Sequence, residues 1–263
     1  MPPSEIRKEA REALKGKWGK AVCTTLIFLA FSFIFEFAQK FLEYDFVIYN
    51  ILDLIFLVVS IPLSFGLTIV FMQLKRNENV GVFSFIKEGF SRLGKAFGIW
   101  LHTLLKLLLP IIGLILALMI FLVLNTALTQ LNSTLTLLVV ALLITTTIYI
   151  ACRALLYVLA YNISYDNPEL SSKECVNKSE ELMKGHRGNY FLLMLYFVAL
   201  TLVVVIALTI VLFIVIAPLF NIHLLVAALL SRMLIIPISM IYITTYMQVA
   251  TVCFYERVLN NKK

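Results

Sequence analysis

Three basic residues, Lys106, Arg153 and Arg232, lie inside long apolar runs of the sequence. A charged side chain in an apolar segment is costly, so each is a candidate functional residue by default. Each apolar run has one end next to a segment rich in Lys and Arg. Lys106 and Arg153 each lie about nine residues, or about 13 Å of helix rise, from that end of their run. We find no acidic residue at that depth, so we expect these side chains to meet an anion, backbone carbonyls or water. Our hypothesis is a pocket in the inner leaflet that holds a phosphate-bearing lipid or another anion.

Snorkelling is the alternative for Lys106 and Arg153, because a long side chain can carry its charge to the headgroups while its stem stays in lipid. Arg232 lies nearer the opposite end of its own run. Glu36 and Asp53 are expected on that opposite side as well, and they are the candidate charge partners of Arg232.

The remaining residue types do not form the pattern of a known enzyme or metal site. The three histidines, His102, His186 and His223, are scattered, and none has a second ligand at a credible spacing. The sequence contains no H-E-x-x-H and no G-x-S-x-G motif, and residues 184–188 lack the Walker pattern that cradles phosphates. We therefore expect no enzymatic activity, no metal ion and no cofactor.

The composition indicates that lipid is the solvent of this chain. Of its 263 residues, 61% are hydrophobic and 14% are charged, whereas soluble domains are roughly 45 to 50% apolar and about 25% charged. A helix needs about 20 apolar residues to cross a bilayer. The sequence therefore predicts an all-α polytopic membrane protein with six transmembrane helices, arranged as three hairpins, over residues 21–38, 54–74, 97–124, 135–161, 190–217 and 224–255. The last run is too long for one straight crossing, so it should tilt, overrun the interface or kink at Pro237.

The positions of the other Lys and Arg residues predict the orientation. Except for Lys40, they all fall in four segments that the six runs place on one side: 1–20, 75–95, 173–187 and 257–263. Basic segments remain in the cytoplasm, so we expect both termini there. The partners expected are the lipid bilayer, anionic inner-leaflet lipids and a membrane-protein partner, and no nucleic acid. A cleavable signal peptide over the first run is disfavoured because no small-x-small site follows it.

The four cysteines, Cys23, Cys152, Cys175 and Cys253, show no C-x-x-C pairing. With the predicted topology, none of them falls in an external loop. Because disulfides need an oxidising compartment, we expect reduced thiols.

Short segments before the first, third and fifth runs resemble one another. Residues 13–21 read ALKGKWGKA and residues 182–190 read LMKGHRGNY, so both contain Lys-Gly-x-x-Gly. Residues 91–96 read SRLGKA, with Ser91 where the earlier glycine would fall. We interpret these as repeat glycines, Gly16, Gly19, Gly94, Gly185 and Gly188, within a single transmembrane domain (1–263) of three pseudo-repeats, about 1–74, 82–161 and 168–255. The alternative is that lead-ins to membrane helices commonly use Lys and Gly.

Each repeat segment is expected to end a short amphipathic helix on the cytoplasmic interface. Apolar stripes at helical spacing are Ile6, Ala10, Ala13 and Leu14 in the first, and Ile86, Phe90, Leu93 and Phe97 in the second. The third begins with a capping-box pattern, in which Ser171 and Glu174 satisfy free backbone N–H groups. Such helices lie naturally along an anionic leaflet, and the glycines let the chain turn into the bilayer.

Four segments of the sequence together are similar to a bacterial membrane family, domain of unknown function 975. They are the opening at 4–21, the second-span motif LSFGL at 63–67, and the loop segments DNPELS at 166–171 and SEELMKGH at 179–186. The resemblance implies a multi-pass protein of the bacterial cytoplasmic membrane and brings no assigned activity. One departure is that Pro110 is followed by Ile111, Ile112 and Gly113, where the family usually has a proline-glycine break.

Two functions are compatible with these features. The first is a non-enzymatic membrane-organising, lipid-interacting or accessory protein that presents basic helices to the inner leaflet. The alternative is a transporter or lipid-translocating protein that binds an anionic substrate at its buried basic residues. Two-span repeats would all share one orientation, which differs from the inverted repeats of many transporters.

Overall fold

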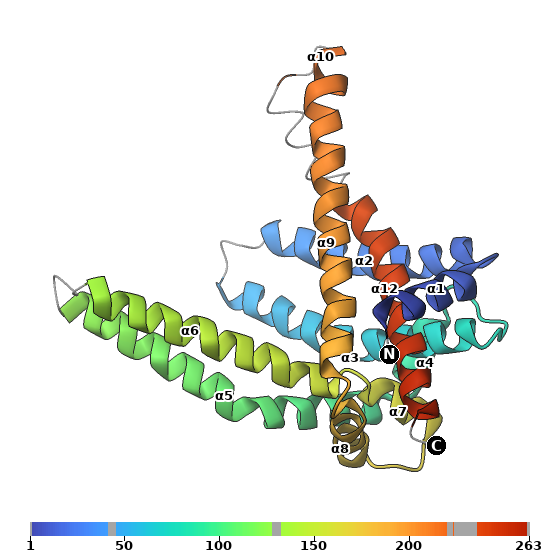
Figure 1. The fold of residues 1–263 in the computed structure, drawn as a ribbon, viewed down its shortest axis with the longest axis horizontal. Helices are drawn as coiled ribbons and strands as arrows, with labels where there is room; N and C mark the ends of the chain where they lie inside the picture. The colour runs from blue at the N-terminus through green and yellow to red at the C-terminus, as the bar shows by residue number, and fades with distance from the viewer. Residues whose placement is uncertain (1, 42–45, 128–132, 220–222, 224–235, 262–263) are drawn as a thin grey trace. The chain divides into compact units, whose positions relative to one another are not determined.

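The structure is a computed structural model that describes residues 2–41, 46–127, 133–219, 223 and 236–261, and these residues form helices joined by short connections (Figure 1). The predicted all-α class is confirmed. In chain order the helices are α1 (Pro3–Leu14), α2 (Trp18–Phe41), α3 (Phe46–Lys75), α4 (Ser84–Ser91), α5 (Leu93–Ala127), α6 (Ser133–Ala154), α7 (Ala160–Asp166), α8 (Ser172–Met183), α9 (Arg187–Val211), α10 (Ala217–Leu219) and α12 (Ile236–Asn260).

Within the described residues, five segments are helical, long and apolar enough to cross a membrane: Trp18–Gln39, Val47–Lys75, Leu93–Val123, Val140–Asp166 and Arg187–Ile214. They overlap the first five predicted spans. The beginning of the predicted sixth span, residues 224–235, lies outside the described residues. Its second part forms α12, whose first turn contains Pro237, so the sixth crossing remains a prediction.

The middle hairpin differs from two straight crossings. α5 continues without a break through Pro110 as one long helix. The family's usual proline-glycine sequence is absent at this position, and the helix is not interrupted there. α6 ends at Ala154, where a 3-10 turn, Leu155–Tyr157, leads into α7. The predicted fourth span therefore contains a change of helix type after Ala154, and Arg153 lies in the last turn of α6.

The chain divides into two compact units, which are described separately. The first unit contains residues 1–93 and 188–263, and the second unit contains residues 94–187. The division falls at Gly94 and Gly188, two of the repeat glycines. The predicted single domain and its three pseudo-repeats remain predictions.

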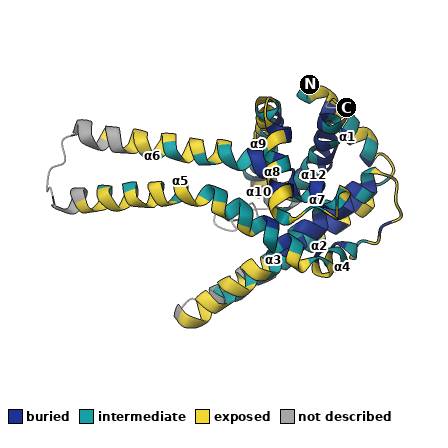
Figure 2. Ribbon diagram, turned by 90° about the horizontal axis from the view of Figure 1, so that it is seen from below, coloured by how far each residue is buried: buried dark blue, intermediate teal, exposed yellow. Residues whose placement is uncertain are grey.

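In the first unit, α3 has one exposed half and one buried half (Figure 2). Val47, Ile51 and Leu54 are exposed, whereas most residues from Ile61 to Leu74 are buried. Apolar side chains exposed in this way on a span-length helix are suited to lipid. α3 contacts α2, α4 and α12, and Leu63 and Val70 of its buried half pack in a core with Phe85 of α4 and Phe28 of α2.

α1 packs against α12 in the same unit. Ile6, Ala10 and Leu14, three members of its predicted apolar stripe, are fully buried. Tyr246 of α12 strengthens the contact, because its hydroxyl donates to the Arg7 carbonyl oxygen at 2.8 Å and accepts from Arg11 Nε at 3.1 Å. The stripe of α1 therefore contacts protein.

The turns that end α1 and α8 have the same backbone geometry. Lys15 and Lys184 have φ and ψ near −60° and +120°, and the glycines that follow have positive φ, 78° for Gly16 and 86° for Gly185. In both turns the amide two residues after the lysine donates to the carbonyl of the last helical residue, at 2.9 and 3.1 Å. This matches a type II turn, which favours glycine at its third position. The predicted helix ends at Gly16 and Gly185 thus have a shared physical reason.

Candidate functional site

Lys106 and Arg153 lie in the second unit beside an acidic residue, Glu180 of α8. Lys106 Nζ donates to Glu180 Oε2, and Arg153 Nη1 lies 3.9 Å from Glu180 Oε1. The expectation that no acidic residue reaches the depth of Lys106 and Arg153 is therefore wrong. The carboxylate comes from the predicted third amphipathic helix, which packs against α7 and the 3-10 turn that follows α6.

The elements around this cluster are held by polar contacts of α8. The predicted capping box is confirmed, because Glu174 N donates to Ser171 Oγ at 3.3 Å and Ser171 N donates to Glu174 Oε2 at 2.7 Å. Ser179 is fully buried, and its hydroxyl donates to the Leu156 carbonyl oxygen at 2.7 Å. That carbonyl lies in the 3-10 turn where α6 has ended. Ser179 and its neighbour Glu180 therefore fix α8 against the segment that carries Arg153.

The start of α5 is attached to the start of α8. Lys95 Nζ donates to the carbonyl oxygens of Pro168, at 3.2 Å, and Leu170. Gly98 faces Ser172 so closely that an added Cβ would lie 2.3 Å from the serine Oγ. Because Lys106 follows on the same continuous helix, this attachment sets its position toward α8.

The cluster contains two cations and one carboxylate. Hydrogen bonding from Lys106 is the largest influence on Glu180 and lowers the pKa of its carboxyl group, with a further contribution from the charge of Arg153. Arg153 makes only the longer contact with Glu180, and its Nε is buried without a hydrogen-bond partner among the described residues. The aromatic rings of Tyr149 and Tyr157 lie 5.9 Å from Arg153 Cζ and 5.4 Å from Lys106 Nζ. This arrangement has a surplus positive charge and N–H donor capacity for an anion.

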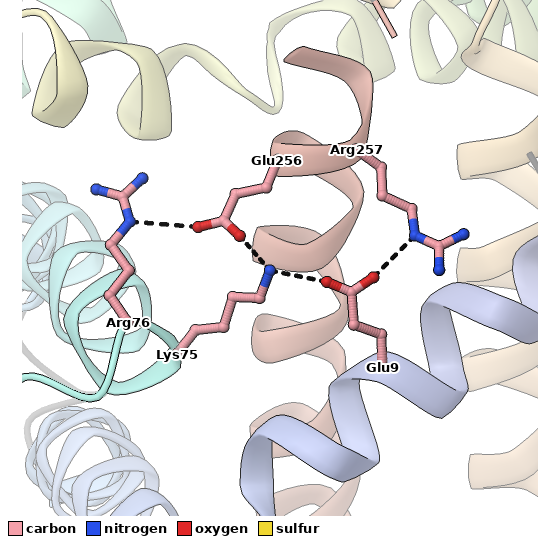
Figure 3. Close-up of polar contacts among 5 residues, drawn as sticks. All are labelled: Glu9, Lys75, Arg76, Glu256 and Arg257. Atoms are coloured by element: carbon pink, nitrogen blue, oxygen red, sulfur yellow. Dashed lines mark hydrogen bonds and ion pairs between the residues drawn. The ribbon is translucent and has the colours of Figure 1, made fainter. Parts of the chain in front are cut away.

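A second group of charges, which the sequence did not reveal, joins three helices of the first unit (Figure 3). Lys75 at the end of α3 donates to Glu9 Oε1 of α1 at 2.8 Å and to Glu256 Oε2 of α12. Arg76 Nε donates to Glu256 Oε1 at 3.2 Å. The side chain of Lys75 is only 13% exposed, so these pairs are partly desolvated.

Arg257 completes this charge network. Its Nε donates to Glu9 Oε2 at 2.8 Å and its Nη1 lies 2.7 Å from Glu5 Oε2. Burial raises the pKa of Glu9, but hydrogen bonds from Lys75 and Arg257 outweigh that effect, so the pKa is lowered overall. Three carboxylates face three cations, and each carboxylate has a cation within hydrogen-bond distance. The network of Glu5, Glu9, Lys75, Arg76, Glu256 and Arg257 is therefore balanced and suits a structural role.

The other predicted site residues are not brought together in the described part of the chain. Arg232 and the side chain of Glu36 lie outside the described residues. Asp53 accepts a hydrogen bond from Gln39 Nε2 at 3.3 Å. The predicted pairing of Arg232 with Glu36 or Asp53 stays a prediction.

The repeat glycines divide into two groups. Gly16 and Gly185 occupy the positive-φ turns described above. Gly19, Gly94 and Gly188 do not have positive φ, and a Cβ at each would meet no atom within 4 Å. Only Gly16 and Gly185 among the five therefore require glycine for their backbone conformation.

Among the described residues, no group of three His, Cys, Asp or Glu side chains could hold a metal ion. His102 Nδ1 donates to the Gly98 carbonyl oxygen at 2.7 Å, a contact within its own helix. All four cysteines are free: Cys23 and Cys152 are exposed, whereas Cys175 and Cys253 are buried.

Comparison with known proteins gives one finding. No curated protein and no solved structure matches the chain. Residues 1–262 match the family described as Protein of unknown function (DUF975), as the four sequence segments predicted. The match covers almost the whole chain, so this protein belongs to the DUF975 family.

Proposed function

We propose that this protein is a non-enzymatic, multi-pass protein of the cell membrane that binds the phosphate of anionic lipids through Lys106 and Arg153. The observation that carries the proposal is the surplus cation in the second unit, together with the Arg153 Nε that is buried without a partner among the described residues. A guanidinium presents a fork of N–H donors that fits phosphate oxygens, and an ammonium beside it adds a point charge.

Both termini are cytoplasmic in this proposal. Its support is the charge network of the first unit, in which Arg257 near the C-terminus pairs with Glu5 near the N-terminus at 2.7 Å. Lys75, at the end of the second span, contacts Glu9 and Glu256 in the same network. Three basic segments thus meet on one side of the first unit, and such segments are retained in the cytoplasm. A reporter fused after Lys263 tests this, because activity outside the cell would contradict it.

The test of lipid binding is native mass spectrometry of the purified protein after exchange into mixed phosphatidylglycerol and phosphatidylcholine. We expect selective retention of phosphatidylglycerol, which falls about tenfold in the double variant Lys106→Gln, Arg153→Gln. A charge-assisted hydrogen bond contributes about 1.5 to 3 kcal/mol, so the loss of two donors suffices for that decrease. Inorganic phosphate is added in a second arm; displacement of the lipid would identify a site for the free ion.

The matched control is Lys8→Gln with Lys173→Gln, which removes the same charge from two exposed positions outside the cluster. We expect this control to retain phosphatidylglycerol as the wild-type protein does. Arg153→Lys keeps the positive charge but loses the forked N–H donors of the guanidinium. Its retention of phosphatidylglycerol should therefore lie between that of the control and that of the double variant. Equal retention by all variants would show that Lys106 and Arg153 merely extend toward the headgroups, and the proposed site would be rejected.

A further inference from the structure

α4 and the residues at its two ends have two different apolar faces. Phe85 is 1% exposed and Gly89 is buried, whereas Phe83, Ile86, Phe90 and Leu93 are 65, 40, 41 and 40% exposed. Ile86 and Phe90 lie four residues apart in α4 and so share one face beside the buried face, while Phe83 and Leu93 flank the helix at its two ends. We refer to these four residues as the α4 stripe. The polar residues, Ser84, Lys87, Glu88, Ser91 and Arg92, occupy the remaining sector.

The buried face attaches α4 closely to α3. A Cβ on Gly66 would lie 1.9 Å from the Phe85 carbonyl oxygen, and one on Gly89 would lie 2.1 Å from the Pro62 carbonyl oxygen. The two backbones are therefore in direct contact, which only glycine at both positions permits. This contact fixes the direction of the α4 stripe.

The side chain of Phe85 completes the attachment. It packs in a core with Leu63, Val70 and Val80, and its ring meets the ring of Phe28 of α2 edge to face at 6.3 Å. α2 and α3 thus cover one side of α4. The α4 stripe faces away from this core, because its members remain exposed.

The position of α4 along α3 indicates what covers the stripe. Pro62 and Gly66 lie where α3 changes from its exposed half, which includes Leu57 and Val58, to its buried half. The exposed half has the surface of a lipid-facing span, and α4 contacts α3 directly beside it. The α4 stripe continues that apolar surface at its edge.

The polar sector of α4 is suited to the headgroup region. Lys87 is exposed, and Arg92 pairs with Glu88 at 3.7 Å. An interfacial helix characteristically has an apolar face in the acyl boundary and basic residues toward anionic headgroups.

From these observations we infer that α4 is an interfacial anchor: its stripe inserts into the acyl chains of the adjacent leaflet while Lys87 contacts anionic headgroups. This inference uses residues of the first unit and is independent of the headgroup site at Lys106 and Arg153. It also distinguishes the three amphipathic helices, because the apolar faces of α1 and α8 are buried in protein. Membrane contact through a stripe belongs to α4.

The experiment uses single spin labels on the full-length protein in vesicles of phosphatidylglycerol and phosphatidylcholine. The exposed cysteines are removed as Cys23→Ser and Cys152→Ser, and the buried Cys175 and Cys253 stay. Labels are placed at Ile86→Cys and Phe90→Cys on the stripe, and at Lys87→Cys and Ser91→Cys on the polar sector as matched controls. Labelling of the background without an added cysteine checks that the buried thiols do not react.

For each spin label, the collision rate with oxygen is compared with the collision rate with a nickel chelate. Oxygen concentrates among acyl chains, whereas the nickel chelate stays in water. We expect labels at Ile86 and Phe90 to favour oxygen severalfold, and labels at Lys87 and Ser91 to favour the nickel chelate. Equal access of nickel to both sectors would place α4 in water and overturn the inference. Protection of the stripe from both reagents would show a protein on this face, and that result would overturn it as well. Binding of phosphatidylglycerol at Lys106 and Arg153 has no influence on either readout.

Discussion

Each unit contains a carboxylate from an amphipathic helix paired with a lysine of a span-length helix. In the first unit Glu9 of α1 meets Lys75 of α3, and in the second unit Glu180 of α8 meets Lys106 of α5. The surroundings differ, because the network around Lys75 has equal numbers of carboxylates and cations, whereas Glu180 is shared by two cations. The same kind of contact therefore belongs to a charge-balanced network in the first unit and to a cluster with one cation in excess in the second.

The largest expected effect is on stability, through Lys75→Met. Removing this cation leaves Glu9 and Glu256 partly buried with their strongest shared partner absent. Loss of one partner from a fully buried pair costs about 3 kcal/mol or more. Glu9 and Glu256 are partly exposed and keep Arg257 and Arg76 as partners, so we expect a cost of about 2 to 3 kcal/mol. We expect a clear decrease of the thermal unfolding midpoint in detergent.

The matched control is Lys106→Met, because the Lys106 side chain is 32% exposed, against 13% for Lys75, and it pairs with one carboxylate where Lys75 pairs with two. Its cost should be about 1 kcal/mol or less, as for exposed ion pairs. Equal decreases for Lys75→Met and Lys106→Met would remove the distinction between a closed network and an open cluster.

The next effect concerns the turns that end the two carboxylate-bearing helices. Gly16→Ala and Gly185→Ala place a Cβ at φ of 78° and 86°, which costs roughly 1 to 2 kcal/mol each. Gly19→Ala and Gly188→Ala, in the first turns of α2 and α9, are the controls and should be neutral or stabilising. Unfolding midpoints of the four variants test this. Equal behaviour of all four would contradict the assignment of a shared positive-φ turn.

A smaller effect is expected on binding, from Glu180→Gln. This change removes the carboxylate that competes with an anionic lipid for Lys106 and Arg153. Retention of phosphatidylglycerol should rise about fivefold, the equivalent of about 1 kcal/mol for one partly exposed ion pair. Glu256→Gln, in the balanced network, should leave retention unchanged. Lower retention in Glu180→Gln would show that this carboxylate positions the cations and does not compete for them.

The smallest effect is the dependence of stability on pH. The pKa values of Glu9 and Glu180 are lowered in the folded protein by their cations, although burial opposes this at both residues and most strongly at Glu9. A lowered pKa means that the stabilisation is complete above the unfolded value, about 4.3, and is lost as pH falls through the folded value. Unfolding midpoints from pH 7 to pH 3 should therefore stay level at first and fall only below about pH 4.3. Glu9→Gln and Glu180→Gln should each reduce the fall, and a decrease that begins near neutral pH would contradict this origin.

Periodicity and charge predicted much of the local structure because they reflect local physics. Apolar runs long enough to span a bilayer became five span-length helices, and the Ser171–Glu174 pattern became a capping box. Lys106 and Arg153 were identified as candidates because a charge in an apolar run is unusual whatever it contacts.

The partners of those charges could not be read from the sequence. Glu180 was missed because depth was counted along the spans, whereas an amphipathic helix packed at their ends supplies the carboxylate. Contacts within the charge network join residues far apart in the chain, such as Lys75 and Glu256, which are 181 positions apart. Apolar stripes on α1 and α4 look equivalent in sequence, yet only tertiary packing buries the stripe of α1 and leaves the α4 stripe exposed.

The first unit is discontinuous in the chain, and this has a consequence for synthesis. Glu9 emerges from the ribosome early, but its partner Arg257 is made 248 residues later. At about 5 to 20 residues per second, that delay is roughly 12 to 50 s. During that time the apolar face of α1 has no α12 to cover it, whereas residues 94–187 form an uninterrupted stretch whose contacts can assemble first. The newborn chain therefore has to cover its first helix with lipid or a chaperone until the last helix is made.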